Sequence, residues 1–188
     1  MPSFYQTTAI LSLLSTLLPS PIAAAPTPAP LTNFLLITTT SPNPCTNTSA
    51  LPNVSATSLF DPLDQTPFLL RLIGPGYDSL PRFNLSSSNA NASLTTLTEG
   101  PEGFGEYVYT SIPPTQGAEL TFLPPGAGKA VGGNGTLGLR GGFLLTVDGV
   151  AEGWAVCAGP EGEQVIAWKN STTGCVDTYI QAVAKAPY

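Results

Sequence analysis

The sequence contains no histidine, so the Asp and Glu carboxylates are the main candidates for catalytic residues. Serine–histidine hydrolysis, cysteine–histidine hydrolysis and histidine-ligated metal sites all require an imidazole and are therefore excluded. Two carboxylates at the right separation in a cleft would be sufficient to hydrolyse a glycosidic bond. The candidates are Glu99, Glu102 and Glu106 in one group, and Asp148 with Glu152 in the other. Their glycine-rich surroundings are typical of solvated turns, so we do not expect an enzyme.

Aromatic side chains offer a binding function in place of catalysis. Trp154, Trp168, Tyr107 and Tyr109 lie on candidate strands and could present a flat platform for a sugar ring. Packing in the core is the alternative for all four. Trp154 also lies near Cys157, and a ring buried against a disulfide is a common arrangement in β-sandwiches. The pattern leaves both interpretations open.

Charge is sparse and acidic, with twelve Asp and Glu against six Lys and Arg and a formal net charge of −6. Surfaces that bind nucleic acid depend on clustered Lys and Arg, so we expect no nucleic-acid partner. No cofactor is expected. Three cysteines, two of which are expected to form a bridge, are too few for a structural zinc site.

The amino-terminal stretch is typical of a secretion signal. An apolar run over 9–18 is followed by the small residues Ala23, Ala24 and Ala25. The run is too short to span a bilayer, and the alternative to a signal peptide is a buried N-terminal helix. We expect neither a membrane span nor a lipid anchor in the rest of the chain. The expected organisation is a signal peptide over 1–25, a proline-rich connector over 26–32 and one β domain over 33–188.

Glycosylation acceptors are unusually frequent. Six of the nine asparagines begin the pattern Asn-x-Ser/Thr, namely Asn47, Asn53, Asn84, Asn91, Asn134 and Asn170. Together with the signal peptide they predict a secreted glycoprotein, extracellular or held in a cell wall.

The fold class is predicted from short apolar runs that Gly, Pro, Asn or Asp interrupt about every eight to twelve residues. This pattern indicates an antiparallel all-β domain, either a sandwich or a closed barrel, because both cover sheet faces and edges. Helices are not expected, and Thr57–Asp64 would form a single turn at most. The expected strands are Phe34–Thr39, Phe68–Ile73, Leu80–Leu85, Tyr107–Ser111, Leu120–Leu123, Thr136–Leu139, Phe143–Val147, Trp154–Cys157, Gln164–Lys169 and Thr178–Val183.

The last third of the chain predicts a meander of consecutive strands with a turn at Asp148–Gly149. Three cysteines permit three pairings, and the short separation of Cys157 and Cys175, both beside strand-like runs, favours a bridge between these two. Cys45 lies in a polar loop, where it would pair between chains or remain a simple thiol.

A family resemblance lies in the same region. Gly142, Phe143, Val147, Asp148, Gly149, Trp154, Val156, Cys157, Trp168, Gly174, Cys175 and Val176 form a pattern that resembles the small secreted fungal proteins that include the cell wall protein PhiA and its uncharacterised relatives. The likeness covers about the last 85 residues. It implies a secreted all-β protein associated with the wall or the medium, supports the Cys157–Cys175 bridge, and brings no catalytic residues with it.

These observations lead to three expectations about function. The first is a secreted glycoprotein with a non-catalytic structural or binding role at the fungal cell wall or surface. The second is an effector or allergen-like protein that contacts a host component, and the third is a glycoside hydrolase with paired carboxylates. The expected partner is therefore a wall polysaccharide or a host protein.

Overall fold

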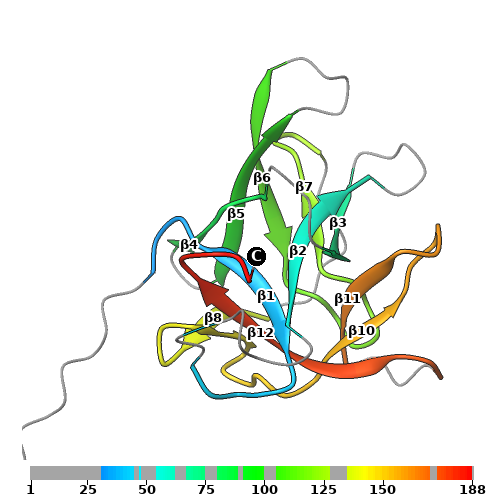
Figure 1. Cartoon of the computed structure of the whole chain (residues 1–188). Coiled ribbons are helices and arrows are strands. Elements are labelled where there is room, and N and C mark those ends of the chain that lie inside the picture. Colours follow the sequence, from blue (N-terminus) through cyan, green and yellow to red (C-terminus); the bar gives the residue numbers. More distant parts are fainter. Residues whose placement is uncertain are drawn as a thin grey trace, which may run out of the picture.

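The computed structural model describes residues 31–44, 47, 54–61, 67–74, 80–88, 91–99, 105–127, 135–169 and 173–187. Within these ranges the chain forms twelve strands and no helix, so the expectation of an all-β domain is confirmed (Figure 1). The strands are β1 Leu35–Thr39, β2 Ser55–Phe60, β3 Phe68–Ile73, β4 Phe83–Ser88, β5 Asn91–Glu99, β6 Glu106–Ile112, β7 Thr121–Leu123, β8 Leu137–Arg140, β9 Leu144–Val147, β10 Trp154–Ala158, β11 Gln164–Trp168 and β12 Val176–Val183.

Six of these strands close into an antiparallel barrel. Their order is β11, β10, β12, β1, β2 and β3, and β3 returns to β11 where Arg71 pairs with Val165. Of the two architectures that the sequence left open, the barrel is the one observed. Closure leaves these six strands without an open sheet edge between the first and the last.

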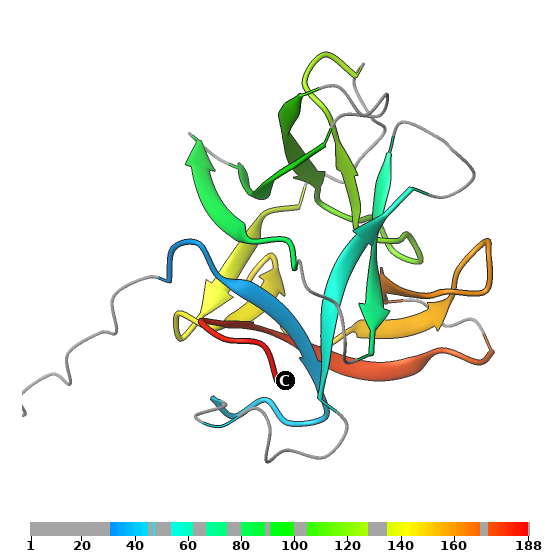
Figure 2. The ribbon, with the colours of Figure 1, turned by 45° about the horizontal axis from the view of Figure 1, so that its top comes forward.

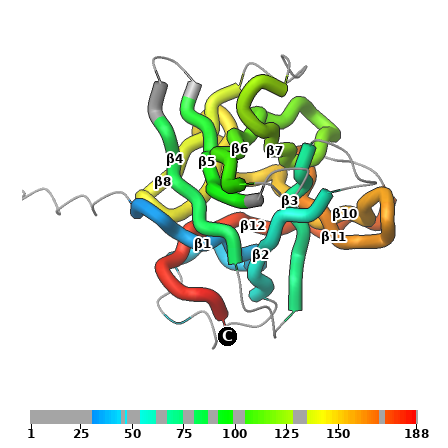
Figure 3. The backbone as a smooth tube through the Cα atoms, turned by 90° about the horizontal axis from the view of Figure 1, so that it is seen from above, coloured from blue at the N-terminus to red at the C-terminus, as the bar shows by residue number. Residues whose placement is uncertain are grey.

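The remaining strands extend from the barrel. The sheet continues from β3 through β7, β6 and β5 to β4, the green and cyan part of Figures 1 and 2. Phe34 and Phe83 exchange backbone hydrogen bonds of 3.0 and 2.7 Å, which bring β4 back to the start of β1. The hairpin β8–β9 pairs with β12 through Leu144 and lies beside β5, as the view in Figure 3 also shows. This arrangement encloses one main core.

The main core is built from large side chains on one face of the strands. Its fully buried members include Phe34, Leu36, Leu70, Phe83, Leu94, Tyr109, Phe122, Leu145, Trp154 and Ile166. Successive residues of a strand point to opposite faces, so the neighbours of these residues form separate, smaller clusters. Ala155, Cys157 and Ala167 form such a cluster on the opposite face of β10 and β11.

Two expectations from the sequence require correction. A single turn was expected at Thr57–Asp64, but the first four residues of this segment belong to strand β2, which pairs with β1 and β3. The last strands also do not pair in consecutive order: β10 and β11 form a hairpin, but β12 inserts between β10 and β1, and β9 pairs with β12. The turn at Asp148–Gly149 is confirmed, with φ angles of 52° and 78° that suit Asp and Gly in a tight hairpin.

Candidate functional site

The two tryptophans do not form a surface platform. Trp154 is 0% exposed and Trp168 is 4% exposed, and their rings meet edge to face with centroids 4.8 Å apart. The indole N–H of Trp154 donates to the carbonyl of Leu145 at 3.0 Å. Neither ring face is open to a ligand, so the platform expectation is wrong for both residues and core packing is what occurs. A ring that stacks on sugar must lie at the surface, and these two fill the interior.

The two tyrosines of the expected platform are also separated. Tyr109 is fully buried and packs edge to face against Phe68 with centroids 4.8 Å apart, whereas Tyr107 is 43% exposed. Burial raises the pKa of the Tyr109 hydroxyl, with a smaller contribution from the charge of Asp61. Of the four aromatic residues, only Tyr107 remains accessible, so no joint aromatic surface is formed.

The predicted disulfide is present between Cys157 and Cys175, whose Cα atoms are 4.3 Å apart. Cys157 lies on β10, and Cys175 directly precedes β12, where Val156 pairs with Val176. The bridge therefore joins two directly paired strands. Trp154 does not pack against it, because Trp154 belongs to the main core and Cys157 to the cluster on the opposite face. Cys45 lies outside the described residues.

The structure describes three of the six glycosylation acceptors. Asn47 is exposed, Asn84 is exposed on β4, and Asn91 begins β5 opposite Ser88. Asn53, Asn134 and Asn170 lie outside the described residues. The alternation of a strand places the first and third positions of the Asn84 acceptor pattern on one face.

The structure describes four of the five carboxylates that could do chemistry, and it places only those of the first group opposite each other. Glu106 pairs with Glu99 in the β5–β6 register, and Glu102 lies outside the described residues. Asp148 has a structural role, because its Oδ1 accepts a hydrogen bond from the backbone N–H of Thr136 at 2.8 Å. Glu152 instead forms an ion pair with Arg140 at 3.0 Å.

A pocket that the sequence did not predict places Glu152 near a second carboxylate. It encloses about 310 Å³ and lies where β1 ends, β10 begins and β12 starts. The residues that line it are Thr40, Glu152, Gly153, Asp177, Thr178 and Tyr179. Glu152 and Asp177 are exposed, Tyr179 is half-buried, and the Thr178 hydroxyl donates to the carbonyl of Thr39 at 3.2 Å. The pocket therefore combines acceptor carboxylates, hydroxyls and one aromatic ring.

The strand pairings explain why these distant residues meet. Thr39 pairs with Tyr179, and Trp154 pairs with Thr178, so the residues just beyond β1 and just before β10 converge on β12. Gly153 suits this convergence, because its φ of 122° is unfavourable for other residues and a Cβ there would lie 3.4 Å from the Trp168 ring. The sequence offered no signal for the pocket, since it depends on the insertion of β12 beside β1.

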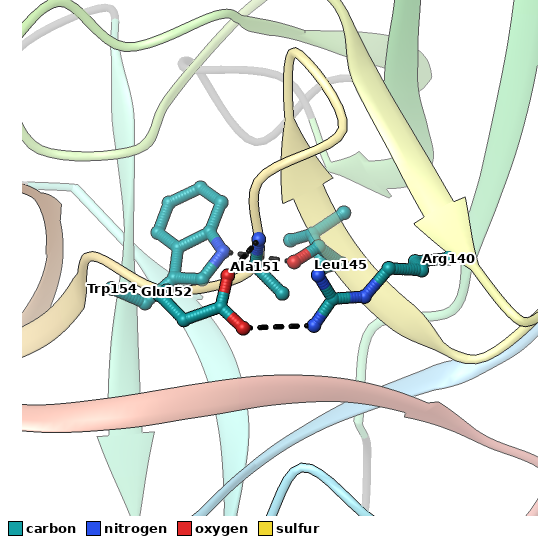
Figure 4. A network of polar contacts seen from close by, with 5 residues as sticks. All are labelled: Arg140, Leu145, Ala151, Glu152 and Trp154. Atoms are coloured by element: carbon teal, nitrogen blue, oxygen red, sulfur yellow. Dashed lines mark hydrogen bonds and ion pairs between the residues drawn. The ribbon is translucent and has the colours of Figure 1, made fainter.

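The contacts of the Glu152 carboxylate favour its charged form. Figure 4 shows its carboxylate between the guanidinium of Arg140 and the backbone of Ala151, which donates to it at 3.2 Å. The hydrogen bond from Arg140 is the main cause that holds the pKa of this carboxyl below its ordinary value. A group that must donate a proton in glycoside hydrolysis needs a raised pKa instead. Glu152 is therefore suited to accept hydrogen bonds rather than to act as an acid.

We predict that Arg140→Gln raises the pKa of Glu152 towards its ordinary value, because the largest cause of the lowering is lost. A carboxyl whose pKa is lowered by folding contributes stability above its unfolded pKa, and the contribution disappears as the pH falls through the folded value. The effect on stability is expected to be small, since the pair is exposed. A carboxyl titration by NMR of the two proteins measures the shift, and equal midpoints would contradict this assignment.

Two further observations concern the described part of the chain. It contains no group of three or more Cys, Asp or Glu side chains placed to hold a metal ion. Nor does it contain a helix that is long and apolar enough to cross a membrane.

Comparison with protein-family models, curated proteins and solved structures finds no significant match for this chain.

Proposed function

We propose that this chain is an exported glycoprotein that binds saccharide without catalysis at a fungal cell wall or surface, through the pocket at the start of β12. The observation that carries the proposal is the convergence of Asp177, Glu152 and Tyr179 on one pocket of about 310 Å³. Exposed carboxylates can accept hydrogen bonds from sugar hydroxyls. The ring of a tyrosine offers an apolar face to the C–H groups of a sugar. A concave site with a few polar groups is typical of small-ligand recognition.

The electrostatics of the pocket support binding over hydrolysis. A glycosidase requires one carboxyl that stays protonated until it donates to the leaving group. Glu152 has the opposite tendency, because Arg140 lowers its pKa. The acidic character of the chain, with a net charge of −6, also suits an uncharged polymer better than a polyanion.

The proposal is tested by retention of the secreted protein on insoluble chitin, β-1,3-glucan and mannan. We expect selective retention on one polymer, and we expect Asp177→Asn or Tyr179→Ala to weaken it about tenfold, which corresponds to about 1.4 kcal/mol. Tyr107→Ala and Glu106→Gln are matched controls, because they alter an exposed tyrosine and an exposed glutamate outside the pocket. Their retention should equal that of the wild type.

The opposite results have defined meanings. If no polymer retains the wild-type protein, the saccharide proposal is wrong and contact with a host protein becomes the function to test. If a polymer retains all variants equally, wall binding holds but the pocket does not carry it. Near-ultraviolet circular dichroism confirms that each variant is folded, since Trp154 and Trp168 are packed together in the core.

A further inference from the structure

An apolar patch lies on the outer face of the extended sheet. Leu97 on β5 and Val108 on β6 are directly opposite each other in the register, and they are 54% and 48% exposed. The surface continues into a groove of about 400 Å³ that Val108, Ile112, Leu123 and Pro124 help to line. A group that covered these adjacent aliphatic side chains and the groove beside them would remove apolar surface from water, which is favourable.

A glycosylation acceptor lies on the same face of the sheet. Asn84 is exposed on β4 and pairs with Thr95. Thr95 and Leu97 point to the same face of β5, because side chains of a strand alternate. Leu97 is therefore the diagonal neighbour of Asn84, about 7–8 Å away between Cα atoms, and Val108 lies one strand further.

The side chain of Asn84 already has an orientation that suits modification. Its Oδ1 accepts a hydrogen bond from the backbone N–H of Asn33 at 2.7 Å, and Arg82 donates to the carbonyl of Asn33 at 3.0 Å. An N-linked glycan is attached through the amide nitrogen and leaves the oxygen free to accept. The hydrogen bond fixes Oδ1 towards Asn33, so Nδ2 turns away from Asn33 and can carry a sugar without breaking this contact.

We propose that Asn84 carries an N-glycan whose first N-acetylglucosamine residues lie across β5 and β6 and cover Leu97 and Val108. The inference rests on the proposed export of the chain, because only an exported chain meets the glycosylation machinery. The pyranose faces carry C–H groups that can pack on aliphatic side chains, while the hydroxyls and acetamides remain in water. The glycan thereby converts an apolar sheet face into a hydrated one.

The test compares glycoforms of the protein secreted from a glycosylating host. Peptide mapping by mass spectrometry is expected to find a glycan on Asn84. Ser86→Ala removes the acceptor pattern but retains the Asn84 side chain and its contact with Asn33. We expect this variant to bind the dye ANS several-fold more strongly than the wild type, whereas Asn47→Gln, which removes another exposed acceptor, should not.

Two more variants keep the result interpretable. Asn84→Gln also removes the acceptor but retains Ser86 and its hydrogen bond with Ser93, so stronger ANS binding by this variant too would show that loss of the glycan, and not loss of that hydrogen bond, exposes the patch. Leu97→Thr and Val108→Thr combined with Ser86→Ala should return ANS binding to the wild-type level, because both aliphatic residues of the patch are then replaced by polar ones. An unmodified Asn84 in a protein glycosylated at Asn47 would overturn the inference, as would unchanged ANS binding by Ser86→Ala. Retention on polysaccharide is measured separately, so the proposed function stands or fails on its own.

Discussion

Replacing Trp154 by alanine is expected to lower the free energy of unfolding by about 3–5 kcal/mol, the range typical of a deleted buried aromatic ring. Trp154 is 0% exposed, packs against Trp168 and donates to the carbonyl of Leu145, so alanine removes packing and a hydrogen bond together. Domains of this size are stable by about 5–15 kcal/mol, and the loss is therefore a large fraction. The melting temperature should fall by roughly 6–20 °C.

Two further variants separate the causes. Trp154→Phe retains an aromatic ring but loses the indole donor, and the unpaired Leu145 carbonyl should cost about 1–3 kcal/mol. Tyr107→Ala is the control, because Tyr107 is 43% exposed and substitutions at the surface usually change stability by about 0.5 kcal/mol or less. Denaturant titration followed by fluorescence measures all three proteins. A Trp154→Ala protein as stable as Tyr107→Ala would refute the placement of Trp154 in the core.

The strands that the sequence predicted well have strongly apolar or β-branched runs. Leu35–Thr39, Phe68–Ile73 and Gln164–Trp168 were expected within one residue at each end, because apolar and β-branched side chains favour a pleated, buried surface. The Cys157–Cys175 bridge was also predicted, from the short separation of the two cysteines and their positions beside strand-like runs. Local composition and spacing were therefore sufficient to predict these strands and the disulfide.

Two strands were missed because their composition is polar. Ser55–Phe60 and Asn91–Glu99 are rich in Ser and Thr and contain few large apolar residues. Tertiary pairing decides their structure: β2 is held between β1 and β3, and the Thr57 hydroxyl donates to the carbonyl of Leu36 at 3.1 Å. A periodicity argument does not detect a strand whose stabilising partners lie far along the chain.

The candidate site was predicted least well, for the same reason. Asp177 and Tyr179 reach Glu152 and Thr40 only because β12 inserts between β10 and β1, which no local signal indicates. The expected aromatic platform failed for a different reason, because both tryptophans are buried. Strand alternation predicts that Trp154 and Cys157 point to opposite faces, but it does not predict which face meets solvent when a barrel and an added sheet cover both.

Reduction of the Cys157–Cys175 disulfide is expected to lower the free energy of unfolding by about 3 kcal/mol, since the bridge closes a loop of 18 residues. In the chain-entropy model the stabilisation comes from the restricted unfolded chain, and the melting temperature should fall by roughly 6–12 °C. The double variant Cys157→Ala with Cys175→Ala should match the reduced wild-type protein. Cys45→Ser is the control and should remain as stable as the oxidised wild type.

The location of the bridge also predicts where the weakened protein opens. Only Val156, Ala155 and Trp154 of β10 pair with the first three residues of β12, and this short pairing is one of the contacts that close the barrel. Without the covalent link, amide hydrogen exchange should accelerate at Val176–Thr178 more than at Ile180–Val183, which the longer pairing with β1 retains. Equal acceleration over the whole of β12 would indicate that the bridge acts through the unfolded state alone. A selective increase at the β10 pairing would show that it also secures the closed barrel and, with it, the pocket in which Asp177 and Tyr179 lie.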